Sequence, residues 1–217
     1  LVSSRDGLTW KKVQFPDDAG GSEVFIPNGP EGGNGGRNDG GYMTAETLSA
    51  GRGYWIKHGA GSVGKSVGTL LLDDTIEVAA KWNMVGSLSR PVDVSSIQAE
   101  PVSITVTDFY GYSPITGYYT ADTILPGSGY WVKCSEAGEL IVSTGGPSSA
   151  RKRERVITAE PERMNVLTFT SEGKTRTLRF TEEAPAAGEA RAFELPPPPP
   201  GGGFDVRYPE GASVCFG

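Results

Sequence analysis

The run of residues most suggestive of chemistry is GAGSVGKS, Gly59–Ser66, which matches the phosphate-loop pattern G-x-x-x-x-G-K-[ST]. A working phosphate loop follows a buried parallel strand and opens a helix, whose free N–H groups hold the phosphates. Here the preceding GYWIKH alternates in polarity, and the following SVGTLLLDDTIEV carries Gly68 and many β-branched residues. A helix beginning at Lys65 would end after about one turn if Thr69–Asp74 were the acid-bearing strand. The pattern favours a turn, and a nucleotide-using enzyme is the less favoured hypothesis.

Residues for other kinds of catalysis are few. The only histidine, His58, stands beside Gly59 in an expected turn, and one histidine with two distant cysteines does not make a typical zinc site. No spacing among the 26 carboxylates singles out a glycosidase pair. We therefore predict a protein that is not an enzyme, with no catalytic residues and no cofactor. Ca²⁺ is the one ion with candidate oxygen ligands, although we expect solvated turns at Asp17, Asp18, Asn34, Asn38, Asp39, Asp73 and Asp74.

Aromatic side chains are the better candidates for binding. Exposed rings could stack on sugars, as in a carbohydrate-binding accessory module of a secreted hydrolase. Trp55 and Trp131, however, stand at the same place in two similar segments, GYWIK and GYWVK, which is expected of core positions. This leaves Tyr110, Tyr112 and Tyr119 as candidate binding-surface aromatics.

An internal repeat organises these residues. GYMTAETLSAGRGYWIK (Gly41–Lys57) aligns without gaps with GYYTADTILPGSGYWVK (Gly117–Lys133), and ten of the 17 positions are identical. Upstream, LVSS at Leu1–Ser4 corresponds to MVGS at Met84–Ser87. Each copy reads as a series of short strands, and we expect the GYWxK strand to form a hairpin with the segment after it. Whether the copies form one body around a pseudo-two-fold axis or two separate bodies stays open.

The rest of the chain is also β-rich. Asn165–Phe180 predicts a hairpin with its turn at SEGK, five prolines predict a polyproline segment, and FDVRY, Phe204–Tyr208, reads as a further strand. The predicted fold is all-β: repeat 1 over residues 1–74, repeat 2 over 75–147, and a third segment over 148–217. The third segment comprises a linker, the hairpin and the Pro/Gly-rich stretch, and we expect it to be an incomplete further domain. Both repeats are expected to be small antiparallel sandwiches or barrels.

Composition restricts the partners. The net charge of −6 argues against nucleic acid, because phosphate binding needs a basic face, and the short basic run Arg151–Arg155 is expected to be a solvated linker. No stretch reaches the roughly 18 apolar residues of a membrane helix. Cys134 and Cys215 allow one disulfide without requiring it. The sequence opens in mid-strand, so we expect a piece of a longer polypeptide.

The combination of WNMVGSLS, PGSGYWVK and FELPPPPPGGGFDVRY resembles a repeated β-module found near the C-terminus of large secreted bacterial proteins, ahead of a type IX secretion sorting tail. The Asn-Pro-rich tail of that family is not among these 217 residues. The resemblance implies an accessory region of an exported protein, extracellular or at the cell surface, and it carries no catalytic residues. The predicted function is a structural or adhesive module acting as spacer, assembly or attachment domain. Its expected partners are other domains of the parent chain, extracellular components or polysaccharide.

Overall fold

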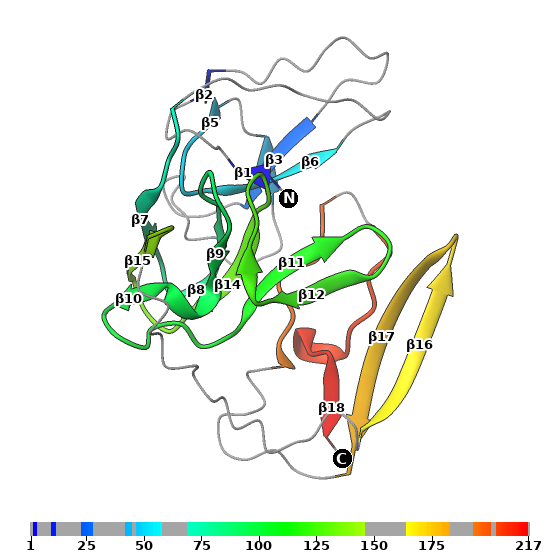
Figure 1. Ribbon diagram of the computed structural model, residues 1–217. Helices are drawn as coiled ribbons and strands as arrows, with labels where there is room; N and C mark the ends of the chain where they lie inside the picture. Colours follow the sequence, from blue (N-terminus) through cyan, green and yellow to red (C-terminus); the bar gives the residue numbers. More distant parts are fainter. Residues whose placement is uncertain are drawn as a thin grey trace.

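The computed structural model describes residues 2–3, 10–11, 23–27, 42–44, 47–57, 69–145, 164–182, 193–200 and 203–216. These residues form short strands joined by turns and brief 3-10 segments, and none of the described residues lies in an α-helix (Figure 1). The prediction of an all-β chain built from small antiparallel sheets is confirmed. The abundance of Val, Ile, Thr and aromatic residues in the strands favours this all-β fold, because such side chains pack well on a pleated surface.

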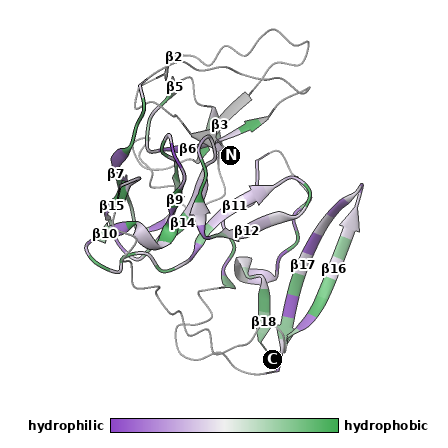
Figure 2. Cartoon of the chain, viewed as in Figure 1, coloured by the Kyte–Doolittle hydropathy of each residue, from purple (hydrophilic) through white to green (hydrophobic). Residues whose placement is uncertain are grey.

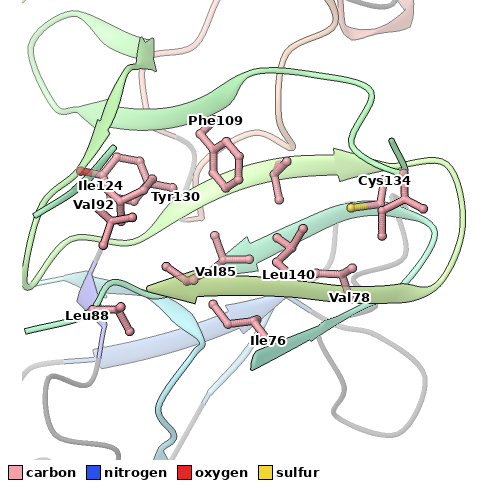
Figure 3. Close-up of a cluster of buried hydrophobic side chains, with 13 residues drawn as sticks. Ile76, Val78, Val85, Leu88, Val92, Phe109, Ile124, Tyr130, Cys134 and Leu140 are labelled. Carbon is pink, nitrogen blue, oxygen red and sulfur yellow. The ribbon is translucent and has the colours of Figure 1, made fainter. Parts of the chain in front are cut away.

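The second repeat is a pair of facing sheets. Its core fills the space between them and includes Ile76, Leu140 and Val132, which are at most 4 % exposed (Figure 3). One sheet has the strand order β10-β15-β7 and the other β12-β11-β14-β8. The strands are β7 (Asp73–Val78), β8 (Lys81–Val85), β10 (Gln98–Glu100), β11 (Phe109–Ser113), β12 (Gly117–Ala121), β14 (Tyr130–Cys134) and β15 (Gly138–Ser143).

A buried asparagine turns the chain from one sheet to the other. The side chain of Asn83 is fully buried, accepts a hydrogen bond from Ala79 N–H at 2.9 Å and donates to the carbonyls of Ala79 and Lys81. Lys81 has a φ of +78° at this corner. Because a buried amide must be hydrogen-bonded, Asn83 fixes the point where β7 ends and β8 begins.

The expected hairpin after the GYWxK strand is wrong for the second copy. β14 pairs with β8 and β11, whereas β15 pairs with β7 and β10, so the two consecutive strands lie in different sheets. The turn residues between them carry the chain across the core. Strand alternation allows this, since Leu140 and Val142 of β15 still face the same core as Tyr130 and Val132 of β14.

The first repeat has the same strand order and register as the four-stranded sheet of the second. Its order β1-β6-β3-β4 corresponds to β8-β14-β11-β12, and Val2 pairs with Tyr54 as Val85 pairs with Tyr130. The hydroxyl oxygens of Tyr54 and Tyr130 each accept a hydrogen bond from the backbone N–H five residues upstream. The strands are β1 (Val2–Ser3), β3 (Glu23–Pro27), β4 (Tyr42–Thr44) and β6 (Gly53–Lys57). A second equivalent pair is β2 (Trp10–Lys11) with β5 (Thr47–Leu48) and β9 (Val92–Asp93) with β13 (Thr123–Ile124).

The two repeats meet at equivalent glycines. A Cβ placed on Gly53 would lie 3.3 Å from Cα of Gly129, its counterpart in the alignment, and 2.8 Å from the carbonyl oxygen of Val85. A contact between a residue and its own counterpart is the mark of a two-fold relation. The repeats therefore lie against each other around an approximate two-fold axis. Their backbones are close enough for the N–H of Gly86 in the second repeat to donate to the carbonyl of Gly51 in the first.

The C-terminal part is a hairpin with one added strand. β16 (Asn165–Ser171) and β17 (Lys174–Thr181) join through Glu172 and Gly173, both with positive φ, as a tight β-hairpin turn requires, and this predicted hairpin is confirmed. The prediction of a strand at Phe204–Tyr208 is wrong. β18 (Val214–Phe216) pairs parallel to β17 instead. Figure 2 shows that hydrophobic residues continue along β16, where Leu167 is 42 % exposed.

Candidate functional site

A cluster of aromatic residues covers the outer face of the four-stranded sheet. The strand alternation that turns Tyr130 and Val132 toward the inner core turns Trp131 to the opposite face, where it is fully buried. The sheet is thus covered on both sides. The aromatic cluster comprises Trp55, Trp82, Met84, Tyr110 and Trp131, with Tyr42, Tyr112 and Tyr118 packed against them.

The rings of the aromatic cluster meet edge to face. The centroids of Trp55 and Tyr112 are 4.7 Å apart at 74°, and those of Tyr112 and Tyr118 are 5.2 Å apart at 66°. This arrangement places the positive edge of one ring on the negative face of another. Because Trp55 comes from β6 of the first repeat and the tyrosines from the second, the rings join the two repeats.

Five prolines, Pro196–Pro200, cross the cluster and form what we call the proline strap. Three consecutive carbonyls of the strap accept hydrogen bonds from three side chains. Arg207 Nη1 donates to Pro196 at 2.8 Å, the Tyr118 hydroxyl donates to Pro197 at 2.6 Å, and the Tyr42 hydroxyl donates to Pro198 at 2.7 Å. The donors come from the C-terminal part, the second repeat and the first repeat.

Burial along the strap has a period of three. Pro196 and Pro199 are buried, while Pro198 between them is exposed. A polyproline II helix has three residues per turn, so residues three apart share a face. The strap therefore turns the face of Pro196 and Pro199 inward. The Cγ of Pro199 is 3.4 Å from the Cβ position of Gly203, and the Tyr112 hydroxyl is 3.8 Å from it.

The phenol groups that hold the strap are kept in their neutral, donating form. Burial raises the pKa of Tyr118 well above its usual value, and burial likewise raises the pKa of Tyr42. The indole Nε1 of Trp55 is buried without a hydrogen-bond partner within the described residues. A protonated phenol is what a carbonyl acceptor needs.

Charged side chains hold the N-terminal end of the strap. Glu194, just before it, forms an ion pair with Lys133 of β14. Arg207, besides binding the strap, pairs with Asp205 at 2.6 Å. Within the described residues no strand pairs with FDVRY, and its Asp and Arg side chains bind each other and the strap.

Arg176 attaches the hairpin to the second repeat. It is 5 % exposed, donates to the carbonyls of Ile115 and Thr175 at 2.8 Å, and reaches the Tyr112 hydroxyl at 3.2 Å. Its guanidinium also lies 5.3 Å from the ring centroid of Phe204. A planar group with several donors can make all of these contacts at once.

The three candidate surface tyrosines have different environments. Tyr110 is only 6 % exposed within the aromatic cluster, so its prediction as a surface residue is wrong. Tyr112 is half-buried beneath Arg176. Tyr119 is 45 % exposed, with its ring across Gly111. The expectation of buried Trp55 and Trp131 is confirmed, at 6 % and 0 % exposed.

The phosphate-loop pattern at Gly59–Ser66 lies outside the described residues, as do His58 and the Asp and Asn residues at positions 17, 18, 34, 38 and 39. The strand before the pattern, β6, is antiparallel to both of its neighbours, unlike the parallel strand that precedes a phosphate loop.

Of the candidate Ca²⁺ ligands, the structure describes Asp73 and Asp74. Asp73 accepts a hydrogen bond from Ser143, and burial raises the pKa of Asp74. Within the described ranges no three His, Cys, Asp or Glu side chains gather as potential metal ligands.

Both cysteines are free thiols, Cys134 in the inner core and Cys215 exposed. Among the described residues there is no helix with the length and apolarity that crossing a bilayer requires.

Sequence reasoning missed the strap contacts, although two signals for them were present. The repeat aligns Tyr42 with Tyr118, and a run of five prolines is a known ligand for aromatic surfaces. Neither signal says which aromatic residues the prolines meet. Comparison of the chain with protein-family models, curated proteins and solved structures found no match.

Proposed function

We propose that this chain is a non-catalytic structural module of an exported multidomain bacterial protein, in which it holds neighbouring parts at a fixed spacing. The exported context comes from the resemblance of WNMVGSLS and PGSGYWVK to secreted β-modules. The mechanical role is supported by the proline strap, which binds all three parts of the chain through Tyr42, Tyr118 and Arg207. A stiff polyproline segment bound at three successive carbonyls restrains the parts it touches.

The carbohydrate-binding alternative has less support. A sugar platform needs exposed, aligned rings, but Tyr110 is buried and Tyr112 is covered by Arg176. Of the three candidates only Tyr119 is well exposed. The large rings of the chain are used to join its own parts, as expected for a spacer.

The double variant Tyr42→Phe/Tyr118→Phe tests the proposal, because it removes two hydrogen bonds to the strap and keeps both rings. Each lost bond costs about 1 kcal/mol, so urea unfolding should show a loss of about 2 kcal/mol. Hydrogen exchange should also speed up at Leu195 and Ser213, whose N–H groups bond across the strap's flanks. Tyr119→Phe, one residue along β12 and exposed, is the matched control.

A spacer role requires the parts to move together. Small-angle scattering should therefore report a single compact shape for the parent chain and a broader distribution for the double variant. An unchanged scattering profile and unchanged exchange in the double variant, with the control also unchanged, would show that the strap restrains nothing.

A further inference from the structure

The surface beneath the proline strap has the features of a peptide-binding groove. Proteins recognise polyproline II chains with rows of aromatic rings and with donors directed at backbone carbonyls. Here the hydroxyls of Tyr42 and Tyr118 donate to adjacent carbonyls of the strap, and Pro196 and Pro199, three residues apart, are both buried. The hydrogen bonds go to backbone groups that any polyproline II chain presents at the same spacing. Recognition therefore depends on the conformation of the strap, and covalent attachment to this chain is not needed for it.

We propose that this groove is a polyproline-binding site that accepts the proline strap of a second copy of the chain in place of its own. The inference rests on the strap contacts of the proposed function, but it concerns binding between chains. The occupant is argued from the strap itself, whose sequence and register already fit the groove. Exchange of an identical element is a low-cost route to a dimer.

The stiffness of the strap favours its binding both to its own chain and to a second copy. A run of prolines is already extended before it binds, so little conformational entropy is lost when it docks. Within one chain the attached strap has the advantage of a high effective concentration. Exchange between copies should therefore emerge when the chain's own strap is weakened.

Two complementary variants test the exchange. The acceptor chain keeps the tyrosines and carries Pro196→Gly, Pro197→Gly, Pro198→Gly and Pro199→Gly, which removes its own ligand. The donor chain keeps the prolines and carries Tyr42→Phe and Tyr118→Phe, which weakens its own groove. We expect each variant alone to be monomeric and the equimolar mixture to form a one-to-one dimer in sedimentation velocity. Near-ultraviolet circular dichroism establishes that the acceptor is folded, and if it is not, Pro199→Gly alone serves as acceptor.

A synthetic peptide with the sequence ELPPPPPG tests the register on the folded acceptor, with tryptophan fluorescence as the readout. Alanine at the peptide position of Pro199, which is buried, should weaken binding about tenfold, whereas alanine at the exposed position of Pro198 should change it less than about twofold. In the acceptor, Tyr42→Phe should weaken binding about fivefold.

The outcomes separate the hypotheses. A mixed dimer together with the peptide register supports the proposal. Peptide binding without a mixed dimer overturns the second copy as occupant and points to a proline-rich segment of another protein. A folded acceptor that binds neither peptide nor donor overturns the binding site itself. That last result leaves the spacer function standing, because the spacer is tested by scattering and exchange of the intact chain.

Discussion

Tyr42 and Tyr118 occupy the same position in the two repeats, and their hydroxyls donate to the adjacent carbonyls of Pro198 and Pro197. One short segment is thus held by both copies of a duplicated strand. Both tyrosines make the same kind of hydrogen bond, because the strap reaches both repeats. The duplicated β-module thus supplies two equivalent tyrosines to one strap.

Alkaline pH should release the strap. Burial raises the pKa of Tyr42 and of Tyr118 above the ordinary value of 10.0. Their stabilising contribution is complete below pH 10 and is lost as the pH rises above it, since the unfolded chain then gives up protons that the folded chain keeps. The free energy of unfolding should fall by at most about 1.4 kcal/mol per pH unit for each tyrosine. Urea unfolding at several pH values between 9 and about 11.5 measures this slope.

The double variant Tyr42→Phe/Tyr118→Phe is the control for that slope. It should flatten the pH dependence above pH 10, whereas Tyr119→Phe should leave most of it in place. If the free energy of unfolding of the double variant falls with pH as steeply as that of the parent chain, other groups cause the loss of stability at alkaline pH.

The contact between the repeats should be intolerant of a methyl group at Gly53. A Cβ there would lie 2.7 Å from Cγ of Met84 and 2.8 Å from the carbonyl oxygen of Val85, so backbone must move. We expect Gly53→Ala to cost about 1–3 kcal/mol in thermal or urea unfolding. Gly145→Ala is the matched control, because the nearest atom there is Ser143 Oγ at 4.0 Å. Equal stability of the two variants would contradict the close approach of the repeats.

Replacement of Arg176 by lysine should detach the hairpin. Lysine keeps the charge but has no planar group to bind Ile115, Thr175 and Tyr112 together. The expected loss is about 2–3 kcal/mol, with faster hydrogen exchange along β17. Arg179→Lys on the same strand, a partly exposed position, should stay within about 0.5 kcal/mol of the parent. If both variants unfold alike, Arg176 is not the attachment point.

The two thiols should react at very different rates. Burial raises the pKa of Cys134 to about 12, so its thiolate is scarce and enclosed, whereas Cys215 is exposed. Titration with a thiol reagent at pH 8 should modify one cysteine in the native chain and two in denaturant. Mass spectrometry of the native product should locate the label at Cys215. Fast labelling of Cys134 in the folded chain would contradict its place in the inner core.

The sequence predicts the elements that depend on neighbouring residues or on the aligned repeat. The tight turn at Glu172–Gly173 and the equivalent registers at Tyr54 and Tyr130 follow from glycine placement and from the aligned repeat. The site was different, because Tyr42 and Pro198 are 156 residues apart and no periodicity links them. The strand expected at Phe204–Tyr208 is wrong for another reason: within the described residues no strand pairs with it, and Arg207 binds Pro196 instead.

The approximate two-fold relation between the repeats has a consequence for direction. Two hydroxyls related by such an axis are the same to a polyproline chain whichever way it runs, so Tyr42 and Tyr118 alone impose no polarity. Arg207 lies outside the repeats and grips only the Pro196 end. Together with the ion pair of Lys133 and Glu194 just before the strap, this contact distinguishes the N-terminal end of the strap from its C-terminal end.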